Sequence, residues 1–245
     1  LYIKFLKTNI IKQITFTGSE NVLNGLADWV YEEEFGMVRA FDWNKDSDNL
    51  AYIVFDETNV PQYSMQIFGN NLYPFQYNFK YPKAGEINSS LDLKIYNLAS
   101  EKTNSVDLSI NTNDYYYIPR LKFSSFSNKL YIQSLNRLQN TLTLSTYELG
   151  SGKIKKIFSE KDETYVDVQE KLFLLDDENF FWLSDRSGFN HIYLVQNDGK
   201  SLKQITSGNW DVAKLLGFNN NTIYYSSTED NSTERVIYSI GLNGK

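Results

Sequence analysis

The chain has 245 residues, which is long enough for one large domain or two small ones with a sizeable core. Its 24 Lys and Arg against 30 Asp and Glu give a formal net charge of −6, which argues against nucleic acid or an anionic membrane as the natural partner. With no Cys and one His, the sequence excludes disulfides, thiolate sites and any site within the chain that needs two imidazoles.

Short aromatic and β-branched runs, broken by Asn, Asp, Ser and Gly, are typical of strands rather than helices. The first predicted strand covers residues 2–4, and strand–turn–strand patterns predict hairpins at residues 41–55, 172–183 and 215–225. The longest apolar run is the six residues 50–55, which is too short to span a bilayer. Residues 1–7 lack the apolar core and cleavage site of a signal peptide.

A tyrosine that precedes a turn ending in lysine recurs along the chain. The tyrosines are Tyr96, Tyr147, Tyr193 and Tyr238, and their turn lysines are Lys102, Lys153, Lys200 and Lys245. Successive tyrosines are 51, 46 and 45 residues apart, and a period of about 40–50 residues with four short strands per unit is the signature of β-propeller blades. Lys12-Gln-Ile-Thr15 recurs as Lys203-Gln-Ile-Thr206, and both copies are expected to be outermost strands.

Tyr2 is expected to mark a fifth copy of the third strand, 94 residues before Tyr96. Because one matching hairpin lies in that interval, we expect one blade with insertions at about residues 21–36 and 57–87. The sequence thus predicts an all-β fold, a partial β-propeller domain over residues 1–245 with about four to five blades of four-stranded antiparallel sheets. Since its first and last residues fall within blades, we expect it to be part of a larger protein. A solitary β-sandwich is the alternative, but it leaves the repeated tyrosine–turn–lysine unit unexplained.

Residues 57–87 are expected to form an extended arm rather than blade core. Val60-Pro61 and Tyr81-Pro82 remove backbone donors from any strand ladder. The segment is rich in aromatic residues that would stay exposed: Tyr63, Phe68, Tyr73, Phe75, Tyr77 and Phe79. An exposed aromatic patch of this size marks an interface.

The one charged, non-repetitive segment reads Asp28-Trp-Val-Tyr-Glu-Glu-Glu-Phe-Gly36. Asp28 is a suitable N-cap, and the residues from Trp29 to Phe35 are expected to form a short helix. Adjacent carboxylates at about 4 Å repel by about 1 kcal/mol in water and about 4 kcal/mol at an effective dielectric constant of 20, so in a partly closed cavity they favour a cation. An ammonium group can satisfy two carboxylates with its three donors. Taken alone, the run is more typical of a solvated helix face than of a binding site.

This segment resembles the signature of the N-terminal β-propeller domain of the dipeptidyl peptidase IV family. Weaker supporting motifs follow in the family's order over nearly the whole chain. They are Phe55-Asp-Glu-Thr-Asn-Val-Pro61, Tyr81-Pro-Lys-Ala-Gly85, Arg137-Leu-Gln-Asn140, Ser184-Asp-Arg-Ser-Gly-Phe-Asn-His191-Ile-Tyr and Thr206-Ser-Gly-Asn-Trp210-Asp-Val.

The resemblance implies a parent enzyme, a serine dipeptidyl peptidase that removes N-terminal dipeptides with Pro, or less readily Ala, in the second position. It implies that a C-terminal α/β-hydrolase domain supplies the catalytic Ser, Asp and His, and that the propeller gates the substrate and binds its free N-terminus. Residue by residue, it places that role on Glu33 and Glu34, with Asp28, Trp29, Tyr31 and Glu32 as supporting residues. It also implies a homodimer formed through the arm, and no cofactor.

Some features of the family are missing from this sequence. It contains no Gly-x-Ser-x-Gly nucleophile motif, so we expect no catalytic residue within it and no peptidase activity from it alone. The missing cysteines are expected of a bacterial homologue, whose parent protein would be periplasmic, in the cell envelope or secreted. The family's aromatic wall residue has no clear counterpart, because Tyr165 and Val166 both remain candidates.

Other residues that could carry chemistry are expected to be structural. His191 matches a structural position of the family and has no nucleophile near it in sequence. Asp46-Ser-Asp48 and Asp176-Asp-Glu178 fall at hairpin turns, where Asp commonly bonds the local backbone, so no metal site is expected there. Three glycosylation sequons, at Asn88, Asn220 and Asn231, would be unused in a bacterial source.

Two functions from different classes remain. The chain is either the substrate-anchoring propeller of a dipeptidyl peptidase or a non-catalytic propeller that serves as a scaffold for protein–protein interaction. The Glu-rich segment favours the first hypothesis, because a scaffold needs no carboxylate pair beside Trp29 and Tyr31.

Overall fold

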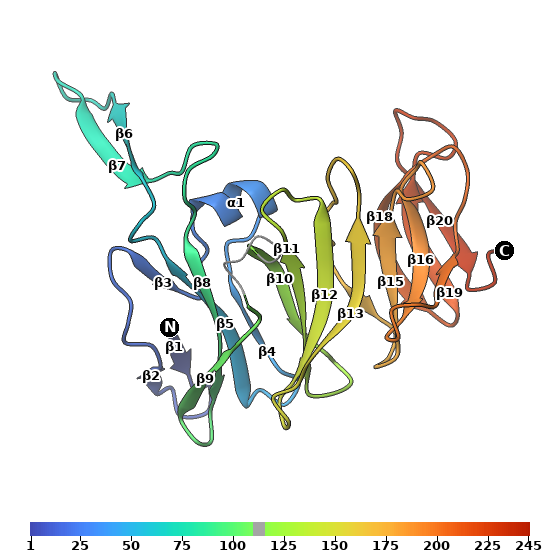
Figure 1. Cartoon of the computed structure of the whole chain (residues 1–245), viewed down its shortest axis with the longest axis horizontal. Coiled ribbons are helices and arrows are strands. Elements are labelled where there is room, and N and C mark those ends of the chain that lie inside the picture. The colour runs from blue at the N-terminus through green and yellow to red at the C-terminus, as the bar shows by residue number, and fades with distance from the viewer. Residues whose placement is uncertain (110–115) are drawn as a thin grey trace.

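The structure is a computed structural model that describes residues 1–109 and 116–245. In these residues it is all-β, with antiparallel sheets of two to five strands and one short helix. The sheets stand side by side in chain order, from β1–β2 at the N-terminus to β18–β20 at the C-terminus (Figure 1). This arrangement is consistent with part of a propeller. No helix in residues 1–109 and 116–245 is long and apolar enough to cross a membrane.

The strands are grouped here by sheet. The first sheet pairs β1 (Tyr2–Lys4) with β2 (Ile11–Gln13), and the second contains β3 (Val22–Asn24), β4 (Phe41–Trp43), β5 (Asn49–Asp56), β8 (Ser90–Asn97) and β9 (Lys102–Val106). The third contains β10 (Tyr117–Phe123), β11 (Lys129–Leu135), β12 (Thr141–Glu148) and β13 (Ile154–Lys161). The fourth contains β14 (Phe173–Leu174), β15 (Asn179–Ser184), β16 (His191–Gln196) and β17 (Leu202–Gln204), and the fifth β18 (Val212–Asn219), β19 (Thr222–Ser227) and β20 (Val236–Gly241). Outside these sheets lie the helix α1 (Trp29–Phe35) and a hairpin of β6 (Gln62–Ile67) and β7 (Phe75–Lys80).

The three hairpins predicted from the sequence are confirmed. Their registers pair Phe41 with Tyr52, Phe173 with Phe181, and Leu215 with Tyr225. Both expected outermost strands are confirmed as well, because Tyr2 pairs with Gln13 and Tyr193 with Gln204, at equivalent places in the two Lys-Gln-Ile-Thr copies.

The four turns that end in lysine share one backbone feature. In each, the residue before the lysine has a positive φ, between 56° and 80°: Glu101, Gly152, Gly199 and Gly244. Three of the four are Gly because a Cβ disfavours this conformation. The turn sequence recurs because the same backbone geometry occurs in all four turns.

The helix interrupts the first strand of the second sheet. β3 and β4 both pair with β5, β3 along Val54–Asp56 and β4 along Leu50–Tyr52, so together they form one broken edge strand. Hydrogen bonds from Gly25 N to Ile53 O and from Ala40 N to Gly25 O close the gap between them. The expected start of the insertion at about residue 21 was wrong, since β3 belongs to the sheet. Its three half-buried residues carry no apolar run that would have signalled a strand.

The second insertion forms an arm that projects from the row of sheets (Figure 1). It is a two-stranded antiparallel sheet of β6 and β7, joined by pairs such as Tyr63 with Phe79. Exposed side chains along the arm include Phe68 at 78%, Tyr73 at 77% and Tyr77 at 54%. At its base the chain is buried, because Glu57 and Val60 are only 7% and 4% exposed. The arm therefore begins after Val60.

Candidate functional site

Helix α1 begins at a buried aspartate. The Asp28 carboxylate accepts a hydrogen bond from Tyr31 N at 2.9 Å and another from Ser89 Oγ at 2.5 Å, and the residue is 4% exposed. Burial raises the pKa of Asp28, while the bonds from Ser89 and from the backbone of Tyr31 and Val30 oppose the rise. The expected N-cap and the expected bounds of the helix, Trp29–Phe35, are confirmed.

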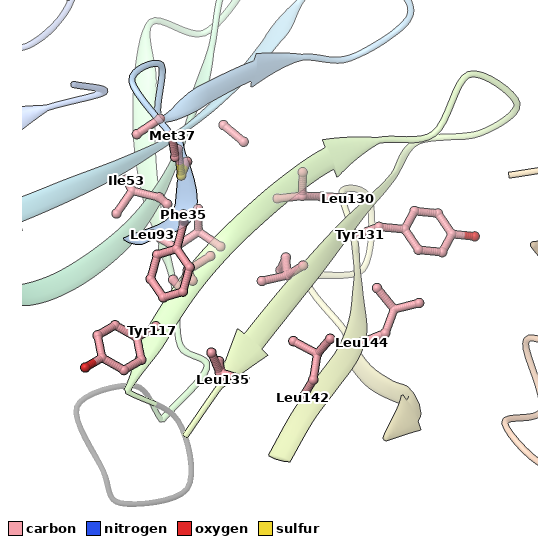
Figure 2. Close-up of a cluster of buried hydrophobic side chains, with 14 of the residues drawn as sticks. Phe35, Met37, Ile53, Leu93, Tyr117, Leu130, Tyr131, Leu135, Leu142 and Leu144 are labelled. Atoms are coloured by element: carbon pink, nitrogen blue, oxygen red, sulfur yellow. The ribbon is translucent and has the colours of Figure 1, made fainter. Parts of the chain in front are cut away.

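The inner face of α1 is packed between two sheets. Tyr31 and Phe35, four residues apart, are 2% and 7% exposed, and the Phe35 ring meets the Tyr117 ring at 5.4 Å. Figure 2 shows Phe35 beside Ile53 and Leu93 of the second sheet and facing the strand that carries Tyr117. These residues belong to the largest hydrophobic cluster of the described residues. The inner face of the helix is therefore part of the hydrophobic core.

Strand β10 of the neighbouring sheet contacts both the middle and the end of α1. The backbone N–H of Ile118 donates to the Tyr31 hydroxyl at 2.8 Å. Arg120 donates from one guanidinium nitrogen to Phe35 O and from the other to Pro119 O, both at 2.7 Å. Burial raises the pKa of Tyr31 well above its usual value, and it lowers that of Arg120, which Glu170 partly offsets. The Tyr31 hydroxyl is thus held protonated, as an acceptor in a fixed place.

The three glutamates Glu32, Glu33 and Glu34 form the outer face of α1. All three are exposed, and none of their carboxylates has a hydrogen-bond or ion-pair partner among the residues that the structure describes. At 100° per residue, Glu33 lies opposite the buried face and Glu32 and Glu34 lie on its two flanks. The helix thus presents unpaired negative charge from a rigidly anchored base.

The first residue of α1 packs against the root of the arm. The Trp29 ring lies 4.0 Å from the Tyr81 ring, and Tyr81 in turn contacts Tyr63 at 5.4 Å and Phe79 at 5.9 Å. Trp29 and Tyr81 are half-buried. A continuous series of aromatic contacts therefore joins the arm to the helix that carries the glutamates.

A second buried carboxyl group lies at the start of the arm. Glu57 is 7% exposed, and its pKa is raised to about 7, first by burial and then by the nearby Asp28 charge, whereas Lys80 lowers it. Lys80 itself donates to Val60 O at 3.0 Å. The base of the arm thus places two carboxyl groups and one ammonium group beneath the N-terminus of α1.

Two adjacent cavities open beside the C-terminal end of α1, and Arg120 and Glu170 line both. One is about 500 Å³ and is also lined by Phe35, Arg39 and Lys122. The other, of about 140 Å³, lies against the third sheet. A separate cavity of about 590 Å³ lies between the fourth and fifth sheets and contains none of the glutamates of α1.

The other residues singled out from the sequence lie apart from α1. His191 is 1% exposed; its ring nitrogens lie 3.1 Å from Thr206 Oγ1 and from Gly208 O, so its expected structural role is confirmed. Of the two wall candidates, Val166 belongs to the core at 8% exposure and Tyr165 is 63% exposed. Tyr165 is thus the one with a side chain accessible to a ligand.

Turn positions account for the acidic pairs at hairpins. The Asp176 carboxylate accepts bonds from the backbone of Glu178 and Asn179, and Asp48 accepts one from the side chain of Asn44. Residues 1–109 and 116–245 contain no group of three or more His, Asp or Glu placed to hold a metal ion.

Sequence reasoning placed the residues of α1 itself but missed their partners. Glu57 lies in the quoted Phe55–Pro61 motif, which was a usable signal. Ser89 and Arg120 reach the helix from 61 and 85 residues away along the chain, and nothing in the local sequence of either indicates the contact.

Comparison with known proteins gives a consistent result. Residues 1–245 match the family model described as Dipeptidyl peptidase IV (DPP IV) N-terminal region. Dipeptidyl peptidase 4 of Arthroderma otae is 32% identical over 249 residues, covering 96% of this chain and 32% of that protein. Inactive dipeptidyl peptidase 10 of Mus musculus is also 32% identical, over 250 residues that cover 95% of this chain and 31% of that protein.

Solved structures are similar over the entire chain. The crystal structure of Porphyromonas gingivalis dipeptidyl peptidase 4 superposes with a TM-score of 0.92 at 40% identity, covering 100% of this chain and 35% of that one. A putative dipeptidyl aminopeptidase IV from Bacteroides ovatus has a TM-score of 0.82 at 23% identity, which shows the likeness of fold. The chain thus spans about a third of the length of the proteins it resembles.

Proposed function

Since this chain belongs to the dipeptidyl peptidase IV N-terminal region family, we propose that it is the propeller part of a serine dipeptidyl peptidase and binds the free N-terminus of peptide substrates. In this proposal Glu33 and Glu34 bind the substrate ammonium group, and a hydrolase domain elsewhere in the parent protein supplies the catalytic residues. The parent removes N-terminal dipeptides with Pro or Ala in the second position.

The observation that carries the proposal is the contrast between the two faces of α1. The inner face is fixed by Tyr31, Phe35 and their neighbours, whereas the glutamates of the outer face have no partner among the described residues. Adjacent carboxylates without a partner repel one another, and a cation between them relieves that repulsion. A peptide ammonium group has three donors and satisfies two carboxylates at once.

Such an arrangement acts as a ruler for the substrate. A fixed helix holds the ammonium group at one distance from the nucleophile, so that only the bond two residues into the peptide reaches it. A peptide with a blocked N-terminus leaves the carboxylates without a partner once water is excluded, and this costs more than a missing methylene group. Specificity for free N-termini then follows from charge rather than from side-chain fit.

The test is the kinetics of Glu33→Gln and Glu34→Gln in the full-length parent. Glutamine keeps the size of the side chain but removes the charge that pairs with the ammonium group. Truncating one partner of a desolvated charge pair costs about 2–5 kcal/mol, so we expect kcat/KM for free-amine X-Pro substrates to fall roughly 30- to 5,000-fold. N-acylated peptides are poor substrates that cannot use the carboxylate pair, so their kcat/KM should show almost no change.

Two control variants complete this test. Glu32→Gln should have a smaller effect, since Glu32 lies on the flank of α1 away from Glu34, and Glu20→Gln removes an exposed acid outside α1. If the outer face of α1 is only a solvated surface, each of these substitutions changes the activation free energy derived from kcat/KM by no more than about 0.5 kcal/mol. Wild-type kcat/KM in both the Glu33 and Glu34 variants would refute the proposed role.

The second candidate, a non-catalytic scaffold, is supported by one specific finding. Among the relatives of similar identity is a protein named inactive dipeptidyl peptidase 10, so a chain of this family need not sit beside a working hydrolase. The full-length parent distinguishes the two candidates. Turnover of Gly-Pro or Ala-Pro chromogenic substrates supports the peptidase, and its absence in a folded parent protein supports the scaffold.

We further propose that the arm pairs two copies of the parent into a homodimer. Its support is the exposure of Phe68, Tyr73 and Tyr77 on a hairpin that belongs to none of the five sheets. Aromatic surface of this kind marks protein interfaces.

A further inference from the structure

We propose that Arg120 is a positioning residue that sets where helix α1 presents Glu33 and Glu34. This inference rests on the proposed function, because it concerns the same binding site. Arg120 belongs to β10 in the third sheet, whereas α1 emerges from the first strand of the second sheet. The residue thus joins two sheets at the point where the glutamates are held.

The two ends of α1 are held by different parts of the molecule. The N-terminal end is anchored within its own sheet, since Ser89 donates to the capping Asp28 just before β8. At the C-terminal end, Gly36 in the left-handed region, at φ 58°, closes the helix back onto Tyr31 O. That closure does not use the Phe35 carbonyl oxygen as an acceptor. Arg120 Nη2 donates a hydrogen bond to this oxygen at 2.7 Å.

A guanidinium group suits this position for two reasons. The last carbonyls of a helix lack intrahelical partners and carry partial negative charge, which a cation at the C-terminus stabilises. Its planar fork also lets Arg120 bond Phe35 O and Pro119 O together, which fixes the arginine to its own strand while it holds the helix. Arg120 thereby fixes the end of α1 relative to the backbone of β10.

This contact is well placed to affect binding at the glutamates. Phe35 immediately follows Glu34, and α1 has seven residues, so a shift of its last turn moves both proposed ligands. The cavities of about 500 Å³ and 140 Å³ that border Arg120 leave room for such a shift once the guanidinium group is removed. Exposed carboxylates on a displaced helix would still be charged but would no longer lie where the substrate ammonium group arrives.

The experiment compares Arg120→Met with Lys122→Met in the full-length parent. Lys122 is a matched control, because it is another cation of β10 and its ion-pair partner is Asp42, at 3.0 Å, rather than a residue of α1. For a free-amine X-Pro substrate we expect Arg120→Met to raise KM about ten-fold with kcat within about two-fold, since the lost binding is common to ground and transition states. Lys122→Met should leave both within about two-fold.

A double-variant cycle separates positioning from general damage. If Arg120 acts through the glutamates, Arg120→Met should lower kcat/KM by less than about two-fold when Glu33 and Glu34 are already Gln. Arg120→Lys, which keeps the charge and can reach one carbonyl, should recover most of the wild-type KM. If the Met variant is not recovered folded, Arg120→Gln carries the same expectations.

The outcomes distinguish this inference from the proposed function. A wild-type KM in Arg120→Met, or an equal loss with and without the glutamates, overturns the role of Arg120. If Glu33→Gln and Glu34→Gln themselves leave kcat/KM at the wild-type value, the proposed function falls, and the positioning role falls with it.

Discussion

The carboxyl groups on and near α1 differ in burial. Those of Glu32, Glu33 and Glu34 are exposed to solvent, whereas Asp28 and Glu57 are buried beneath the helix. Asp28 is compensated by hydrogen bonds from Ser89 and from the helix backbone. The nearby Lys80 favours the ionised form of Glu57, whereas burial and the charge of Asp28 disfavour it. The net effect is that ionisation of Glu57 is unfavourable in the folded protein.

Glu57 is therefore expected to make stability depend on pH. Its pKa is raised to about 7 in the folded protein from 4.5, so the folded state binds more protons between these values and stability falls as pH rises through them. Above pH 7 the cost of ionisation is fully present, on the order of 3 kcal/mol. Glu57→Gln mimics the protonated form and should raise the apparent melting temperature above pH 7 but not near pH 5, measured against wild type over pH 5 to 8.

Glu20→Gln is the control for this pH series, because Glu20 is an exposed acid outside the cluster. It should track wild type at every pH. A difference between Glu57→Gln and wild type that is the same at pH 5 and pH 8 would show that Glu57 does not titrate with folding.

At the residue scale, the sequence predicts what is local and fails for what acts through space. Asp28 as a cap could be predicted because a cap lies next to its helix. The exposure of Glu33 fits the 3.6-residue periodicity of the helix, since Tyr31 and Phe35 are the buried pair in the structure. Arg120 could not be predicted, since its partner Phe35 lies 85 residues away and in another sheet.

At the scale of elements, the arm and α1 are connected by aromatic side chains. Trp29 at the start of the helix contacts Tyr81, which follows β7 and contacts the aromatic residues of the hairpin. A second copy docked on the arm would therefore lie close to the base of the helix that carries Glu33 and Glu34. If both proposals hold, dimerisation and substrate binding are expected to be coupled through these aromatic contacts.

Removing the arm should abolish the proposed dimer. Pro61 O accepts a bond from Tyr81 N at 2.9 Å, and Gln62 pairs with Lys80, so residues 63–79 can be replaced by a two-residue Asn-Gly turn that keeps Lys80 at the base. We expect the shortened full-length protein to be a monomer by light scattering, because the exposed aromatic residues are lost with the hairpin. A dimer of unchanged mass would contradict the assignment of the arm as the subunit interface.

Elements with strong turn signals could be predicted from the sequence, and those without them could not. The hairpin of β18 and β19 is marked by the run of asparagines at its turn. Strand β3 was missed because its three residues are too few to carry an apolar run. The pairing of β6 with β7 was not predicted either, because the prolines flanking the segment suggested an arm without a ladder, whereas they lie outside the paired residues.

At the scale of the whole molecule, the sheets stand in chain order, and the helix is inserted in a first strand rather than in a connecting loop (Figure 1). Placement on a strand of the sheet gives the glutamates a rigid base, which a loop on the surface would not provide. The repeated tyrosine–turn–lysine unit predicted this architecture because each copy uses the same backbone conformation. The family resemblance, not the repeat, pointed to the function.

The 245-residue chain by itself is expected to show no peptidase activity. No Gly-x-Ser-x-Gly motif occurs in it, and His191 is committed to Thr206 and Gly208 within the core. Purified chain should therefore not hydrolyse Gly-Pro or Ala-Pro chromogenic substrates above background. Turnover that co-purifies with the chain and resists removal of contaminants would mean that a nucleophile lies within these residues.

The central claim, that Glu33 and Glu34 bind a peptide's free N-terminus, is tested most directly by competitive inhibition with an X-Pro dipeptide and its N-acetyl counterpart. In the full-length wild-type protein the free amine should bind at least about 30-fold more tightly, as expected for a desolvated charge pair. In Glu33→Gln/Glu34→Gln the two ligands should bind within about three-fold of each other, because the partner of the ammonium group is gone. The same preference for the free amine in both proteins would contradict the account.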